Sequence, residues 1–301
     1  MASMMSNLVP TVPIGDALAV KEDLSLESAV VTLRKLDARD KTTKIMQYSA
    51  RFFYWWFATT DPMMSKRAFT LYRTTQRSRK AFRMLKVLDE FVKLRHVISA
   101  ARKEGSSEKA LGFLGYTEAL QSARHVIMGI LWTFDNLNFL TTANTINFGV
   151  ARSTRGFSRS WSVASVLSIL LGIESLRKTD QKRREVASDY ADSLRLRALS
   201  PTDDRPVAKT GEQCGPGGLA EREARLKEAL VLANAEHFKS WLVVLKGALD
   251  LTCAVNISGM DIPKRLLGRK LNDGIIGVTG CASALCVLYN NWPARPQQKI
   301  G

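Results

Sequence analysis

The stretch "FTLYRTTQRSRKAFRMLKVLDEFV", residues 69–92, decides the fold class because its apolar and basic side chains recur at helical spacing. At about 100° per residue, a stripe roughly 120° wide holds Leu71, Ser78, Ala81, Phe82, Leu85, Leu88 and Val92. The other side holds Arg73, Arg77, Lys80 and Arg83, with Arg79 and Lys86 at its flank. Tyr72, Val87 and Phe91 lie off the stripe. The stretch therefore predicts a basic amphipathic helix.

The same type of pattern covers most of the chain and predicts an all-α fold of long amphipathic helices. Helical patterns run over residues 25–58, 63–103, 107–148, 158–198, 220–260 and 263–290, and strand-type alternation is scarce. Four regions follow from composition. They are a flexible lead-in over 1–24, a basic helical region over 25–199, a linker rich in proline and glycine over 200–219, and a C-terminal helical region over 220–301. We expect these helices to form a membrane-associated bundle.

The charge of the chain predicts an anionic partner. The formal net charge is +16, and residues 31–104 hold 18 Lys and Arg against 6 Asp and Glu. Such an excess fits either an anionic lipid surface or a nucleic acid. The histidines at 96, 125 and 237 are isolated, and no phosphate-binding loop or nucleophile elbow occurs. We therefore expect neither an enzyme nor a bound cofactor or metal.

The amphipathic stretch has two interpretations. It is either a surface helix that packs its stripe on a core, or a helix that lies in the plane of a bilayer. In the second case the apolar face, defined as Leu71, Ala81, Phe82, Leu85, Leu88 and Val92, enters the acyl chains. Lipid phosphates are then contacted by Arg73, Arg77, Arg79, Lys80, Arg83 and Lys86, each contributing about 1 kcal/mol. Insertion of this face into one leaflet enlarges the area of that leaflet and favours positive membrane curvature.

Six consecutive aromatic residues, 52–57, favour the bilayer interpretation. They follow Arg51 directly and go more than once around a helix, so no single face holds them. Trp and Tyr gather at membrane interfaces, where Lys and Arg extend toward the headgroups. We expect an aromatic interface anchor formed by Phe52, Phe53, Tyr54, Trp55 and Trp56.

The last helical pattern is the best candidate for a membrane span. No charge occurs over residues 274–289, and small residues suited to close helix packing stand at Gly274, Gly277, Gly280, Cys281 and Ala284. A tightly packed soluble helix pair is the alternative, and the flanking charges leave the orientation open. The segment 240–259 is long enough to span, but Lys246 and Asp250 can pair at i, i+4, which favours a protein-facing helix. The apolar run 161–173 is too short to cross unaided.

Three blocks of this sequence resemble the peroxin-11 family in the family's order. The first, "RDKTTKIMQYSARFFYWW", matches through Arg39, Asp40, Lys41, Gln47, Tyr48, Arg51 and Phe52. The second is "SRKAFRMLK", residues 78–86, and the third is the apolar segment "LNDGIIGVTGCASALCVLYNNW", residues 271–292. The chain departs from the family at Ala38, where glycine is usual, and in an expanded linker around 200–218.

The resemblance implies a peroxisomal membrane protein, with its basic N-terminal region in the cytosol, that remodels and elongates the membrane before fission. It also implies self-association and contact with a dynamin-type fission machinery. For some members it implies a pore for small metabolites. The resemblance leaves a metabolite channel as one alternative. The basic charge by itself leaves a helical nucleic-acid-binding protein as another, although no nucleic acid is expected if the resemblance holds.

Overall fold

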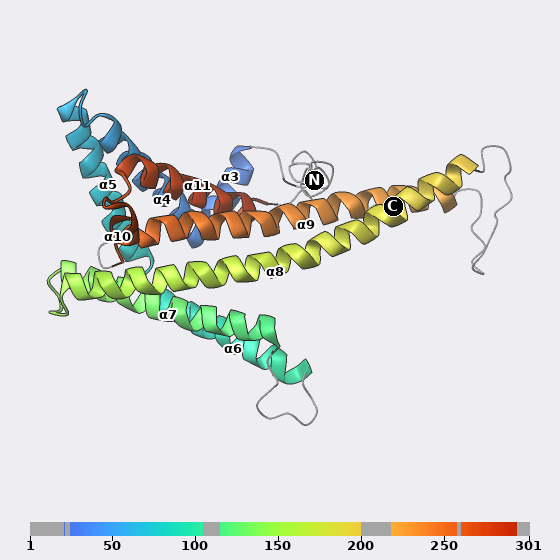
Figure 1. Ribbon diagram of the computed structural model, residues 1–301, viewed down its shortest axis with the longest axis horizontal. Helices are drawn as coiled ribbons and strands as arrows, with labels where there is room; N and C mark the ends of the chain where they lie inside the picture. Colours follow the sequence, from blue (N-terminus) through green and yellow to red (C-terminus); the bar gives the residue numbers. More distant parts are fainter. Residues whose placement is uncertain (1–20, 22–24, 105–114, 200–217, 258–259, 294–301) are drawn as a thin grey trace. The chain divides into compact units, whose positions relative to one another are not determined.

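The computed structural model describes residues 21, 25–104, 115–199, 218–257 and 260–293. Within them it contains helices and no strand, which confirms the all-α prediction (Figure 1). The helices are α3 (Leu26–Leu33), α4 (Leu36–Trp56), α5 (Pro62–Phe82), α6 (Lys86–Glu104), α7 (Tyr116–Thr142), α8 (Val150–Leu199), α9 (Gly218–Val255), α10 (Ile262–Leu267) and α11 (Asp273–Asn291). Nearly all of the predicted linker and of the predicted lead-in lies outside the described residues, and the last two linker positions, 218 and 219, already belong to α9.

The helix predicted over 63–103 is two helices in the structure. The carboxylate of Asp61 accepts from the backbone N–H groups of Met63 and Met64 and so caps the start of α5. The end of α5 carries no such signal. Leu85 has a positive φ of 61°, which breaks the helical path between α5 and α6. Leucine rarely adopts a left-handed backbone conformation, and the helical spacing of apolar residues continues across Leu85. The sequence pattern therefore does not reveal the break.

Two other predicted helices also divide. The pattern over 263–290 becomes α10 and α11, because Gly268 adopts a left-handed conformation at φ 70° that ends α10. The side chain of Asn272 then accepts from the N–H of Ile275 and caps α11. The pattern over 25–58 becomes α3 and α4, with Lys35 in an extended conformation between them.

The chain forms two compact units. One contains, among described residues, the end of α8 (175–199) and the beginning of α9 (218–241). These two segments pair antiparallel through the Ser175 and Ser240 hydroxyls, 2.9 Å apart, and through Lys182 Nζ and Glu236 Oε2, 2.8 Å apart. The other unit spans 25–174 and 242–292, and it holds all the sites described below.

Within the larger unit, α4 packs against both α5 and α11, and α6 packs along α7 (Figure 1). Glycines allow the closest approach of α11 to α4. A Cβ added at Gly280 would stand 2.1 Å from the ring of Tyr48, and one at Gly277 would stand 2.9 Å from backbone atoms of Phe52. The two helices therefore touch along a line that only small residues permit.

Burial in the structure is inverted relative to an ordinary soluble domain. Among the described residues, 24 polar or charged side chains are buried against 15 hydrophobic ones, and many of the latter are alanines. Large apolar side chains such as Leu88, Phe91 and Trp56 lie at the surface. Exposed apolar side chains over a polar interior are unfavourable in water and favourable in an apolar solvent such as the acyl chains of a membrane. The larger unit thus has the character of a protein that faces lipid.

Candidate functional site

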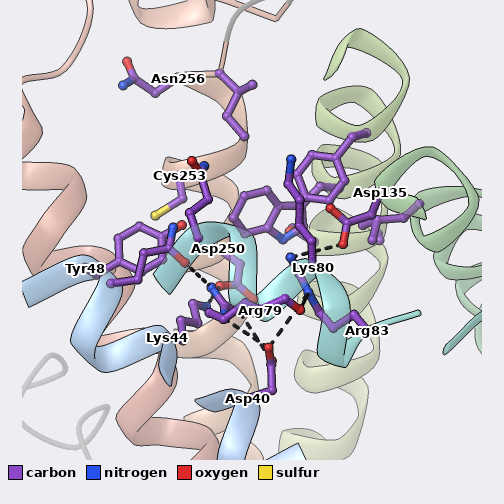
Figure 2. A pocket seen from close by; sticks show the side chains of 18 of the residues that line it. Asp40, Lys44, Tyr48, Arg79, Lys80, Arg83, Asp135, Asp250, Cys253 and Asn256 are labelled. Carbon is purple, nitrogen blue, oxygen red and sulfur yellow. Dashed lines mark hydrogen bonds and ion pairs between the residues drawn. The ribbon is translucent and has the colours of Figure 1, made fainter. Parts of the chain in front are cut away.

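A cavity of about 550 Å³ lies inside the larger unit and is lined mainly by polar side chains. One face of α4 supplies Asp40, Lys44, Gln47, Tyr48 and Arg51 at helical spacing. Matching faces of α5, α7, α8 and α9 complete the wall, and Figure 2 shows side chains from these helices converging on it. The lining holds nine Lys or Arg against four Asp, so its net charge is positive.

The centre of this lining is the ion pair of Arg79 with Asp40 (Figure 2). Arg79 donates from Nε to Asp40 Oδ1 at 3.1 Å and from Nη2 to Asp40 Oδ2 at 3.3 Å, which makes a bidentate pair. Arg79 Nη1 also donates to Gln47 Oε1 at 2.7 Å. Burial by itself raises the pKa of Asp40, but the charges of Arg79, Lys41 and Arg83 outweigh it and hold this pKa well below its usual value.

A second polar cluster joins α4, α9 and α11. Lys44 Nζ donates to Asp250 Oδ1 at 2.9 Å and to Ser283 Oγ at 2.8 Å. Lys246 Nζ donates to Asp250 Oδ2 at 2.6 Å, which confirms the i, i+4 pair predicted from the sequence. Lys44 and Asp250 form the buried ion pair, and Lys246, whose side chain is 32% exposed, shares the same carboxylate from a position that solvent reaches.

The apolar face of α5 and α6 lies at the surface. Leu85 is 63% exposed and Leu88 57%, while Leu71, Phe82 and Val92 are each about half exposed, and Ala81 is also exposed. Most of the fully buried side chains of these helices are polar, namely Ser65, Thr75, Arg79 and Glu90, and Ala101 is the apolar exception. This stretch therefore presents its apolar side outward and directs much of its charge toward α4 and α7.

Four of the six cations predicted to contact lipid phosphates are engaged inside the chain. Arg79 is only 7% exposed and pairs with Asp40, Arg83 Nη2 lies 3.1 Å from Asp135 Oδ2, and Lys86 Nζ lies 3.0 Å from Asp37 Oδ1. Lys80 bonds to Asn138. The physical reason is that acidic residues of α4 and α7 lie opposite them, which a helical projection of one segment does not show. Arg73 and Arg77 are exposed, and lipid contact remains a prediction for these two.

The predicted aromatic anchor lies partly at the surface. Phe53, Trp55 and Trp56 are exposed, whereas Phe52 and Tyr54 are half-buried. The Tyr54 ring meets Phe69 of α5 at 5.1 Å between centroids, so the run also joins α4 to α5.

The predicted small residues of α11 face α4. Gly274 lies against Trp55, Gly277 against Phe52 and Gly280 against Tyr48. Ala284 is buried, and Cys281 Sγ lies 3.4 Å from Ser49 Oγ. These residues pack two helices of the same chain together.

Two helices among the described residues are long and apolar enough to cross a membrane. One is α11, as predicted, and the other is Val150–Arg195 within α8. The sequence predicted a helix over 158–198 but did not count it as a candidate span, because the apolar run 161–173 alone is too short. In the structure it continues without a break into helical turns on both sides.

The three blocks on which the family resemblance rests meet in space. Asp40 and Gln47 of the first block bond to Arg79 of the second, and Arg51 Nη2 of the first lies 2.6 Å from Asp273 Oδ1 of the third. The sequence interpretation missed the cavity that these residues line. A signal was present, since Asp40, Lys44, Gln47 and Arg51 place polar groups on one helical face directly before the aromatic run.

Among the described residues, no group of three or more His, Cys, Asp or Glu could hold a metal ion. Most of the charged side chains around the cavity are held in ion pairs, an arrangement suited to binding and packing.

Comparison with known proteins identifies the family of this chain. The family model described as peroxisomal biogenesis factor 11 (PEX11) matches residues 26–292. The chain is also similar to a protein of Dictyostelium discoideum described as "Peroxisomal membrane protein 11 homolog", with 24% identity over 269 residues that cover 89% of this chain and 94% of that protein. No solved structure matches the chain. The chain therefore belongs to the peroxisomal biogenesis factor 11 family, whose members are non-enzymatic biogenesis factors, and is a peroxisomal membrane protein that takes part in peroxisome proliferation.

Proposed function

We propose that this chain remodels and elongates the peroxisomal membrane by inserting the apolar face of α5 and α6 into one leaflet, and that this step promotes fission. The observation that carries the proposal is the exposure of Leu71, Phe82, Leu85, Leu88 and Val92 on helices whose buried side chains are mostly polar. A soluble protein would bury such residues, so their exposure is explained if lipid covers them.

The energetics of insertion support this mechanism. Burying one large apolar side chain contributes about 1.5–3 kcal/mol, so the exposed residues around the junction of α5 and α6 can hold it in the acyl region. A wedge that occupies only one leaflet expands that leaflet and favours curvature. Anionic lipids are the expected partners, because Arg73 and Arg77 remain exposed beside the apolar face.

The proposal predicts that acidic replacements on the apolar face abolish remodelling. The full-length triple variant Phe82→Glu, Leu85→Glu, Leu88→Glu, reconstituted into anionic liposomes, is expected to form no tubules by electron microscopy. The matched control Phe82→Met, Leu85→Met, Leu88→Met keeps apolar side chains at the same positions and is expected to tubulate like the native chain. Circular dichroism of both variants checks that helix content is unchanged. Normal tubulation by the folded acidic variant would refute insertion of this face.

A second prediction concerns the exposed cations. Replacing Arg73 and Arg77 together by glutamine removes about 1 kcal/mol each of attraction to an anionic leaflet, equivalent to roughly a 30-fold loss in affinity. We expect the double variant to need a higher fraction of anionic lipid for the same extent of tubulation. Its folding is expected to be unchanged, since both side chains are exposed. A lipid requirement identical to that of the native chain would show that these two cations do not contact phosphates.

We further propose that the basic N-terminal region faces the cytosol, that the chain self-associates, and that it works with a dynamin-type fission machinery. The family resemblance supports these three points. Protease protection on intact organelles tests the orientation, and co-purification of two differently tagged copies tests self-association. Protection of the N-terminal region would contradict the first point, and failure of the two copies to co-purify would contradict the second.

A further inference from the structure

The end of the cavity between α5 and α7 holds hydrogen-bond donors that the chain itself does not fully use. Lys80 Nζ lines this part of the cavity and bonds to the neutral amide oxygen of Asn138. An ammonium has three donors, so this bond leaves it able to bind an anion. Lys80 is half-buried, and burial is the main cause that lowers its pKa, opposed by the charge of Asp135.

Trp132 of α7 supplies a donor of a different kind. Its side chain is 93% buried, since the residue is 7% exposed, and it lines the same cavity. Its indole N–H has no hydrogen-bond partner among the described residues. An indole nitrogen can only donate, and a buried donor without an acceptor costs about 1–3 kcal/mol. An acceptor oxygen that reached the indole N–H from the cavity would remove this cost.

The local charge identifies the ligand class. Lys41, Arg79, Lys80 and Arg83 form a connected group with two carboxylates, Asp40 and Asp135, which leaves a net charge of +2. Arg83 Nη2 lies 3.1 Å from Asp135 Oδ2, and its guanidinium stacks over the Trp132 ring at 5.5 Å. A compact dianion balances the surplus, and donors on two helices suit oxygens that point in several directions. A phosphate group has both properties.

We propose that this cavity binds a phosphate group, carried by a small phosphomonoester or by a lipid headgroup, between Lys80, Arg83 and the indole N–H of Trp132. The volume of about 550 Å³ is in the range of ligand sites and accommodates the group with part of its carrier. The inference concerns the interior of the larger unit and does not depend on insertion of the apolar face.

The test uses the full-length protein in nanodiscs and measures thermal unfolding by circular dichroism. In phosphatidylcholine nanodiscs, inorganic phosphate or glycerol 3-phosphate is titrated against sodium chloride or sodium acetate at equal ionic strength. In a second arm, phosphatidic acid is included in the nanodisc. A saturable rise of the unfolding temperature with soluble phosphate identifies a solute site, and a rise only with phosphatidic acid identifies a headgroup site.

Three single variants decide whether the effect comes from this end of the cavity. Lys80→Gln is expected to weaken phosphate binding at least tenfold. Trp132→Phe, which keeps the aromatic ring and removes only the N–H, is expected to weaken it about threefold or more. Arg124→Gln is the matched control. It also lines the cavity, but it stands 8 residues from Trp132 along α7, about 12 Å away, and donates to Ser168, so it is expected to change the affinity less than twofold.

Cooperative unfolding of each variant without ligand shows that it is folded, so that its affinity can be compared with that of the native chain. Trp132→Phe and Arg124→Gln are conservative substitutions that are expected to keep the fold. The proposal is overturned if neither arm shows saturable stabilisation, or if acetate stabilises as well as phosphate. It is also overturned if all three variants respond like the native chain.

Discussion

Replacing Asp40 with asparagine is expected to lower the free energy of unfolding of the larger unit by about 3–5 kcal/mol. The substitution removes the bidentate partner of Arg79 and the nearer of the two carboxylates that hold the cluster together. Arg79 is nearly fully buried, so its charge would remain without compensation in a poorly solvating environment. Chemical denaturation in detergent micelles, followed by circular dichroism, measures the loss.

Asp37→Asn is the control for this prediction because it lies one turn earlier on α4. The Asp37 carboxylate pairs with Lys86 and Lys41 but its side chain is 45% exposed, so its loss is expected to cost no more than about 1 kcal/mol. Equal costs for the two substitutions would show that burial of the Arg79–Asp40 pair does not govern stability.

The Arg79–Asp40 pair also predicts that the free energy of unfolding depends on pH. The pKa of Asp40 is lower in the folded chain than the ordinary value of 3.8, so its stabilising contribution is complete above that value and declines as the pH falls below it. The native chain is therefore expected to lose stability below about pH 4. The Asp40→Asn variant should lack this component, because the asparagine side chain does not titrate.

Replacing Gly280 with alanine is expected to cost about 1–3 kcal/mol and to separate α11 from α4. The added Cβ would stand 2.1 Å from the ring of Tyr48, which is buried and cannot move without displacing its neighbours. Denaturation in micelles measures the cost. In a Tyr48→Ala background the same substitution is expected to cost less, since the clash is removed, and additive costs would contradict the contact.

Gly129→Ala in α7 is the matched control for the glycine substitution. A Cβ at Gly129 would meet only Val87 at 3.9 Å, which is an ordinary contact. Alanine is also the better helix former, so this variant is expected to be neutral or more stable by up to about 1 kcal/mol. Destabilisation by both substitutions would indicate a general intolerance of α-helical glycine replacement rather than close packing at Gly280.

The sequence by itself determined the helical class and most of the helix positions, because periodicity is a property of local spacing. It also determined the i, i+4 pair of Lys246 with Asp250, which depends on one helix only. The family resemblance followed from three blocks of residues and is confirmed by the match over 26–292. Local signals such as Asn272 and Gly268 were present but did not outweigh the apolar pattern that continues across them.

Only the tertiary structure decided which side chains of the basic stretch face inward. Periodicity gives the relative angles of Leu85 and Arg79 around a helix, but the partner of Arg79 is Asp40, which lies 39 residues earlier. The cavity likewise is lined by helices that no short window of sequence contains together. Burial and ion pairing depend on contacts between segments that lie far apart in the chain. The sequence therefore specified the amphipathic helix. The packing of α4 and α7 against it engaged four of its six cations inside the unit and left its apolar face outside.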